Sequence, residues 1–188
     1  MRDHHMNRTI IAITGMPGAG KGLVSKVAKE IGFPIFVLGD VIREEAKVKG
    51  ISPTPKNLGR LMLEIREKEG EGVVAIRLLT KMKNEKAKLV IVEGLRSLKE
   101  IEEFEKSHKT IILGVHTSPE ERFQRLVRRK RSDDPKKWEE FVERDRRELK
   151  VGIGDVLALS DIMVINESTK EEFKNKIRPV LMDLREKY

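Results

Sequence analysis

The sequence contains no cysteine, which excludes disulfide bonds, thiolate metal sites and cysteine nucleophiles. Aromatic residues make up only 4% of the 188 residues, and no apolar run approaches the ~18 residues that a membrane-spanning helix requires. Residues 1–6 also lack the apolar core of a secretory signal peptide. We therefore expect a cytoplasmic protein that does not enter a membrane, with a disordered leader over residues 1–7.

Charged residues are abundant instead, at 37% of the chain, and the 39 Lys and Arg exceed the 31 Asp and Glu by a net charge of +8. An excess of positive charge favours anionic partners, with nucleotides the first choice and nucleic acid a weaker alternative. Because basic and acidic residues are interleaved, we interpret much of this charge as solvated helix surface. The high Lys, Glu and Arg content is also typical of thermophilic proteins.

Short β-rich runs alternate with longer helical patterns along the chain, which predicts an α/β fold with a five-stranded parallel sheet flanked by helices. The length corresponds to one domain, over residues 8–188. Two intervals are too long for simple connections, and we interpret them as helical insertions: an acceptor-binding excursion over about 40–86 and a lid over about 125–150. The predicted strands are 8–14, 34–38, 88–92, 110–115 and 161–165.

The segment 15–22, with the sequence GMPGAGKG, lies between the first predicted strand and a helical pattern. Its glycines let successive backbone N–H groups point at an anion, and the positive end of the next helix faces the same place. Lys21 adds an ammonium group that can follow the β- and γ-phosphates. The segment therefore predicts a P-loop that binds ATP through Gly15, Met16, Pro17, Gly18, Ala19, Gly20, Lys21, Gly22 and Leu23.

The residues after the P-loop lysine bear on the metal. The general motif ends in Ser or Thr, whose hydroxyl binds Mg²⁺, but Gly22 and Leu23 follow Lys21 here. We therefore expect Mg²⁺ to be held through water, a carboxylate and the substrate phosphates.

Two arginines follow predicted strands at the positions where ligands bind a parallel sheet. Asp40 and Arg43 come after the second strand, with Asp40 suited to N-cap the helix that carries Arg43, and Glu93 and Arg96 come after the third. The carboxyl ends of parallel strands lie at one edge, where ligands bind. Because phosphoryl transfer depends on alignment and on surrounding cations, these arginines favour a phosphotransferase.

These segments resemble adenylate kinases and related nucleoside monophosphate kinases, in the strings G-x-P-G-A-G-K-G, G-D-x-x-R and E-G-x-R. The resemblance implies that Arg43 and Arg96 bind the acceptor's phosphate and that Glu93, which replaces the family's Asp, organises Mg²⁺ through water. Glu100 stands where the family's Gln recognises the acceptor base. The substrate-binding residues implied are Asp40, Gly94 and Glu100 together with Arg43 and Arg96.

The segment 121–131 resembles the helix that enters the lid of these kinases. By that resemblance Arg125 and Arg129 reach the donor phosphates and act in catalysis together with Lys21 and Arg96. Either Arg144 or Arg147 is then expected to close from the opposite side. A lid of this kind excludes water from the reacting phosphates.

The segment 158–166 resembles the last strand of dephospho-coenzyme A kinases, in which the following loop lies beside the donor base. From about residue 7 to residue 177 the chain resembles an archaeal family of small P-loop proteins, UPF0200, described as adenylate-kinase-related or dephospho-coenzyme-A-kinase-like. That resemblance implies a nucleotide kinase fold, ATP and Mg²⁺.

Three functions are consistent with the sequence. The leading hypothesis is an ATP-dependent nucleoside monophosphate kinase that acts, as a monomer or a dimer, on a small nucleotide acceptor. A second hypothesis is transfer to a hydroxyl of a molecule such as dephospho-coenzyme A, with Asp40 or Glu93 as general base. The third is an ATP-dependent switch that binds RNA or ribosomal partners through its basic surface.

Overall fold

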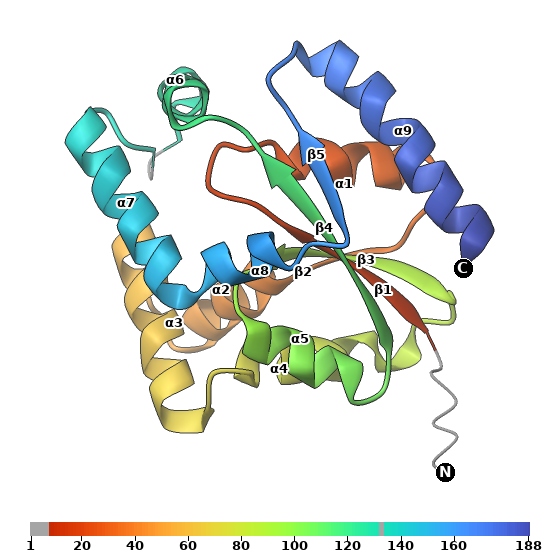
Figure 1. Ribbon diagram of the computed structural model, residues 1–188. Helices are drawn as coiled ribbons and strands as arrows, with labels where there is room; N and C mark the ends of the chain where they lie inside the picture. Colours follow the sequence, from red (N-terminus) through yellow and green to blue (C-terminus); the bar gives the residue numbers. More distant parts are fainter. Residues whose placement is uncertain (1–7, 132–133) are drawn as a thin grey trace.

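The computed structural model describes residues 8–131 and 134–188 and contains one five-stranded parallel sheet (Figure 1). The strand order is β2-β3-β1-β4-β5, which confirms the predicted α/β architecture. The third strand runs further than predicted, through Leu95. The expected leader over 1–7 lies outside the described residues. The strands are β1 (Thr9–Thr14), β2 (Ile35–Val37), β3 (Leu89–Leu95), β4 (Lys109–His116) and β5 (Ile162–Ile165).

Helices surround the sheet, and several begin with side-chain caps that explain their boundaries. Thr54 caps α3, while Ser97 with Glu100 and Thr169 with Glu172 form capping boxes at α5 and α9. The helices are α1 (Lys21–Glu30), α2 (Leu38–Val48), α3 (Pro55–Glu69), α4 (Val73–Lys81), α5 (Leu98–Glu105), α6 (Pro119–Arg129), α7 (Trp138–Val151), α8 (Ile153–Ala158) and α9 (Lys170–Lys187), with a 3-10 turn, η1, at Met82–Asn84.

The central strand β1 is buried along its whole length, and its alternate residues face two separate hydrophobic clusters. Ile10 and Ala12 pack with α2, α3, α4 and α5 on one face, and Ile11 and Ile13 pack with α1 and α9 on the other. Figure 1 shows α1 and α9 on one side of the sheet and α4 and α5 on the opposite side. Covering both faces is what a parallel sheet requires.

The long connection between β2 and β3 contains α2, α3, α4 and η1, and the connection between β4 and β5 contains α6, α7 and α8. One local prediction here is wrong: Asp40 does not N-cap α2. The chain passes directly from β2 into the helix, so that Val37 is the N-cap and Asp40 lies in the first turn. Its carboxylate forms an ion pair with Arg43 one turn later.

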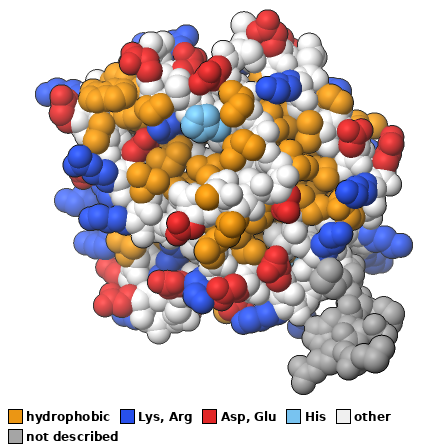
Figure 2. Space-filling model, in the orientation of Figure 1, with side chains coloured by type: hydrophobic (Ala, Val, Ile, Leu, Met, Phe, Trp, Pro, Cys, Tyr) orange, Lys and Arg blue, Asp and Glu red, His pale blue; other side chains and the backbone are white. Residues whose placement is uncertain are grey.

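None of the helices within 8–131 and 134–188 is both long and apolar enough to cross a membrane. Figure 2 shows Lys and Arg side chains intermixed with Asp and Glu over the face that it displays. The charges on this face are therefore interleaved in space as they are along the sequence.

Candidate functional site

The phosphate-binding loop connects the end of β1 to the start of α1, over residues 15–20. Gly20 has the left-handed φ of 106° and directly precedes the helix. At Gly18, where φ is 84°, a Cβ atom would lie 2.9 Å from the carbonyl oxygen of Arg122. A larger residue at Gly18 would therefore clash with backbone, so glycine is needed for the loop to pack against α6.

Lys21 turns back over this loop. Its Nζ donates to the carbonyl oxygens of Gly15 and of Met16, the latter at 3.3 Å. Burial, together with the smaller effect of the positive charge of Arg96, lowers the pKa of Lys21 to about 8, although Glu148 and Glu93 act against the shift. The ammonium group therefore lies in a site where added negative charge would stabilise it.

Arg96 lies in the same small pocket as Lys21, between the phosphate-binding loop and the end of β3. Its Nε is 3.2 Å from Oε2 of Glu148, and its Nη1 is 3.4 Å from Sδ of Met62. The sequence placed Arg96 and Lys21 at one edge of the sheet, and in the structure the two cations line one pocket. The lining residues are Gly15, Pro17, Lys21, Gly94, Leu95, Arg96, Glu148 and Ile153.

A β-bulge at Gly94 shapes this edge. Ile13 pairs with Glu93, but the next residue, Thr14, pairs with Leu95. The hydroxyl of Thr14 donates to the carbonyl of Leu95 at 2.9 Å, which holds the irregular register. Bulges re-aim the side chains around them, and here the bulge lies between Glu93 of β3 and Arg96, which directly follows the strand; both are expected to act in the site.

Glu93 accepts a 2.5 Å hydrogen bond from the hydroxyl of Ser25 on α1. Throughout the described part of the chain, no cluster of three or more His, Asp or Glu side chains could hold a metal. The expectation that Mg²⁺ is held by Glu93 through water and by the substrate phosphates stays a prediction.

Asp40 and Arg43 are paired with each other at the surface, with side chains that are 54% and 56% exposed. The start of α2 does lie beside the end of β3, because Val37 pairs with Glu93 across the sheet. Neither Asp40 nor Arg43 belongs to the residues that line the pocket of Lys21 and Arg96. Their contact with an acceptor stays a prediction.

The structure gives Glu100 a role different from the base recognition implied by the resemblance. Its side chain is 1% exposed and is paired with Arg66 of α3 at 2.5 Å. Its other oxygen accepts from the backbone N–H groups of Arg96 and Ser97, at 2.8 and 3.3 Å. Glu100 thus caps α5 and fixes the backbone of Arg96, and its buried carboxylate is already engaged.

The arginines expected in a lid are held by acidic partners. Arg129 binds both carboxylate oxygens of Asp134, at 2.9 and 2.5 Å, and Arg144 lies 3.6 Å from the same carboxylate. Burial acts to raise the pKa of Asp134, but hydrogen bonds from Arg129 and from the N–H of Arg131 lower it overall. Asp134 therefore gathers two arginines from α6 and α7.

The arginines of α6 and α7 differ in their relation to Lys21. The charge of Arg144 contributes to the lowered pKa of Lys21, whereas Arg147 is 66% exposed and pairs with Glu143 along its own helix. Of the two alternatives from the sequence, Arg144 is thus the one whose charge acts on Lys21, and its closing over the site stays a prediction. Arg125 pairs with Glu121 at 2.9 Å and lies 3.5 Å from the hydroxyl of Thr117.

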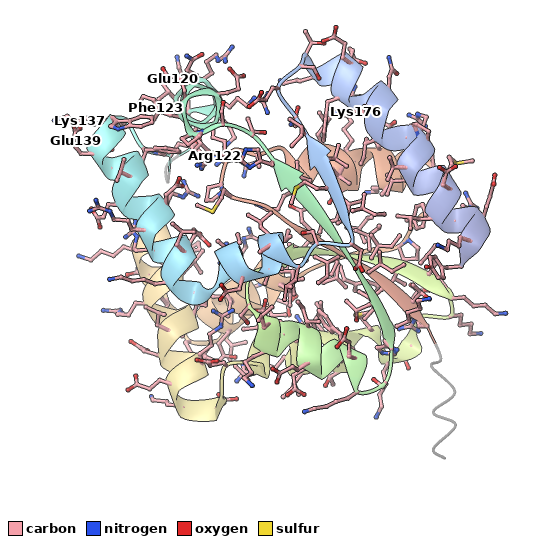
Figure 3. All side chains as sticks on the ribbon, in the orientation of Figure 1. Glu120, Arg122, Phe123, Lys137, Glu139 and Lys176 are labelled. Carbon is pink, nitrogen blue, oxygen red and sulfur yellow. The ribbon has the colours of Figure 1, made fainter. Side chains whose placement is uncertain are left out.

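Arg122 is a residue of the site that sequence reasoning missed. It is 4% exposed and lies on the side of α6 that faces the phosphate-binding loop (Figure 3). Its guanidinium donates to the carbonyl of Pro17 at 3.1 Å and to both oxygens of Asp145 on α7, at 2.9 and 2.5 Å. The ring of Phe141 lies 4.8 Å away. Arg122 therefore ties α7 to the phosphate-binding loop.

The loop after β5 also contacts the phosphate-binding loop. The side-chain amide of Asn166 donates to the carbonyl of Ala19 at 2.8 Å. The hydroxyl of Thr117 lies 3.1 Å from the same carbonyl and 2.8 Å from the carbonyl of Asn166. The ends of β4 and β5 are thereby joined to the loop that would hold the donor nucleotide.

Comparison with known proteins identifies relatives of this chain. A family model described as an AAA domain matches residues 14–142. A UPF0200 protein of Hyperthermus butylicus is 47% identical over 178 residues, covering 95% of this chain and 96% of that protein. The UPF0200 protein of Pyrococcus abyssi is 48% identical over 177 residues, covering 92% and 95% respectively.

Solved structures are similar in fold. TT1252 from Thermus thermophilus is 22% identical with a TM-score of 0.69, covering 95% of this chain and 98% of that one. Shikimate kinase from Acinetobacter baumannii in complex with shikimate is 21% identical with a TM-score of 0.57, covering 94% and 93%. The fold is that of P-loop kinases, and by its similarity over nearly its whole length the chain belongs to the UPF0200 family.

Proposed function

We propose that the protein is an ATP-dependent phosphotransferase, specifically a nucleoside monophosphate kinase that transfers the γ-phosphoryl group of ATP to an acceptor phosphate. The observation that supports this proposal most strongly is the pocket shared by Lys21 and Arg96 at the phosphate-binding loop. The two positively charged side chains come from different parts of the fold and meet at one phosphate-binding loop. This arrangement suits a reaction whose transition state spreads negative charge over several oxygens.

In this proposal the loop of residues 15–23 holds the donor phosphates. The carbonyl oxygens of Gly15 and Met16 now accept from Lys21, and β- and γ-phosphate oxygens would replace them. Glu93 would hold Mg²⁺ through water together with the phosphates, and the bound ion supplies further charge neutralisation. Ser25 keeps the Glu93 carboxylate in place.

Arg96 and Arg43 would orient the acceptor's phosphate, and Arg125, Arg129 and Arg144 would surround the migrating phosphoryl group. A phosphate oxygen is already ionised, so this reaction requires no general base. Positioning and charge account for catalysis, as is typical of phosphoryl transfer.

A hydroxyl acceptor is the alternative, supported by solved structures of similar fold that are named shikimate kinase and gluconokinase. In that case a carboxylate must accept the hydroxyl proton. Asp40 is the exposed candidate, bound to Arg43, and Glu93 is the candidate nearer the loop, bound to Ser25.

The test is an ADP-release assay with ATP, Mg²⁺ and a panel of AMP, CMP, GMP, UMP, dephospho-coenzyme A, shikimate and gluconate. We expect turnover of at least one nucleoside monophosphate, and losses of at least about 100-fold in Lys21→Met and Arg96→Met. Arg147→Met, which removes a 66% exposed arginine, is the matched control and should retain activity. Phosphorylation of the hydroxyl acceptors alone would replace the proposal by the alternative.

The RNA-binding switch is tested separately by measuring RNA affinity at low and high salt, with and without ATP. Binding by a basic surface must weaken steeply with salt. Figure 2 shows acidic side chains among the basic ones on the face displayed, which gives no support to a purely basic surface there. Absence of RNA binding at low salt would contradict this function.

A further inference from the structure

The guanidinium of Arg96 contacts one carboxylate and one thioether. Nε is 3.2 Å from the carboxylate of Glu148, and Nη1 is 3.4 Å from the thioether of Met62. A thioether is a weak acceptor, whereas guanidinium groups bind carboxylate or phosphate best through two parallel hydrogen bonds. With 38% of its side chain exposed, Arg96 has donors available for a better anion.

Glu148 occupies the place of that anion. It comes from α7, its side chain is only 15% exposed, and it lines the pocket of Lys21 and Arg96. The negative charge of Glu148 also acts on Lys21, whose pKa it raises against the larger lowering by burial. Its carboxylate is thus the local counter-charge for both cations that the proposed reaction requires.

The helix that carries Glu148 is anchored independently of this contact. Asp145, one turn earlier on α7, is bound by both Nη atoms of Arg122, and Arg122 also donates to the carbonyl of Pro17. Glu148 can therefore leave Arg96 by rotation of its side chain while α7 keeps its attachment to the phosphate-binding loop.

We propose that Glu148 is an internal anion that competes with the substrate phosphate for Arg96 and thereby determines the affinity of this site for phosphate. The inference rests on the proposed function, because it takes Arg96 as a phosphate-binding group of the reaction. Glu148 offsets part of the charge of the two cations when no phosphate is bound, and an incoming phosphate must displace it from Arg96. The affinity of the site for phosphate is accordingly lower than it would be if Arg96 had no carboxylate partner.

The experiment measures the dissociation constant of inorganic phosphate by calorimetry, with and without saturating ADP and Mg²⁺, for wild type and variants. Glu148→Gln keeps the shape of the side chain and removes its charge. We expect it to bind phosphate about three- to tenfold more tightly, as for loss of one partly buried ion pair. Glu148→Asp shortens the side chain and withdraws the carboxylate from Arg96, so its dissociation constant for phosphate should lie between those of wild type and Glu148→Gln.

Glu143→Gln is the matched control, since it removes the same charge from the same helix at a side chain that is 72% exposed. It should bind phosphate as wild type does. Equal or weaker phosphate binding by a folded Glu148→Gln, with Glu148→Asp likewise no tighter than wild type, would overturn the inference. Failure of ADP to bind would contradict the proposed function, while the phosphate titrations without ADP would still decide the role of Glu148.

Discussion

The hydroxyl of Ser25 donates a 2.5 Å hydrogen bond to the carboxylate of Glu93, across 68 residues of sequence. Ser25 lies on α1, one turn beyond Lys21, so the first helix supplies a hydroxyl to the site even though Gly22 cannot. The hydroxyl reaches the carboxylate expected to organise Mg²⁺. It thus acts on the metal site indirectly, through the position of Glu93.

Substitution Ser25→Ala should raise the Mg²⁺ concentration needed for half-maximal activity by about tenfold, because outer-shell partners of metal-binding groups contribute at this scale. A Mg²⁺ titration of the phosphotransfer assay checks this. Thr80→Ala is the control, since the Thr80 hydroxyl donates to Ile76 within its own exposed helix surface. An unchanged Mg²⁺ requirement in Ser25→Ala would show that this bond does not position Glu93.

Nucleotide affinity should fall as the pH rises above about 8. Burial lowers the pKa of Lys21 in the free protein to about 8, from an ordinary value of 10.5. Bound phosphate favours the charged form, so binding takes up a proton in this range and affinity falls by up to about tenfold per pH unit. Calorimetry in buffers of different ionisation enthalpy measures the proton uptake directly.

The stability of the ligand-free protein should increase with pH above about 8, in contrast to the nucleotide affinity, which should fall. Between about pH 8 and 10.5 the unfolded chain holds more protons on Lys21 than the folded chain does, so this residue contributes a stability that increases with pH. Lys21→Arg, which stays charged, should remove both dependences. Nucleotide affinity that is constant from pH 7 to 9.5 would contradict the lowered pKa.

Loss of Arg122 should destabilise the fold severely. Arg122→Met leaves Asp145, whose side chain is 15% exposed, without its two hydrogen bonds, and breaking such a pair costs about 3–5 kcal/mol. Adding Asp145→Leu should recover part of the loss, because the uncompensated charge is then gone. Denaturant unfolding measures both, with Arg128→Met at a 68% exposed arginine as the control; equal losses in Arg122→Met and Arg128→Met would contradict the anchoring role.

Glu100→Gln should lower stability by about 3 kcal/mol, since it leaves the buried guanidinium of Arg66 without a charged partner. Glu102→Gln, at a 54% exposed carboxylate paired with Lys99, should change stability by less than about 1 kcal/mol. The order of preference among nucleotide bases should be the same in Glu100→Gln and wild type. A changed order of base preference in Glu100→Gln would indicate that Glu100 recognises the acceptor base.

The parts of this protein that the sequence predicted are those made of contiguous residues. The phosphate-binding loop was recognisable because its glycines and Lys21 occupy fixed spacings between a β-branched run and a helical pattern. The five-stranded parallel sheet and the placement of Arg96 at its carboxyl edge followed from the alternation of strands and helices, whereas the strand order came from the structure. Asp40 was misplaced because β2 is short and joins α2 without a loop.

The sequence by itself determined that one edge of a parallel sheet carries a phosphate-binding loop and arginines, since local spacing and strand periodicity are sufficient for that. Only the tertiary structure decided which acidic side chains pair with these arginines. The partner of Arg122 is 23 residues away on another helix, and Glu148 is one of many acidic residues whose sequence positions look alike. Ion pairs act through space, so their assignment required the packing of α7 against the loop, which no local pattern specifies.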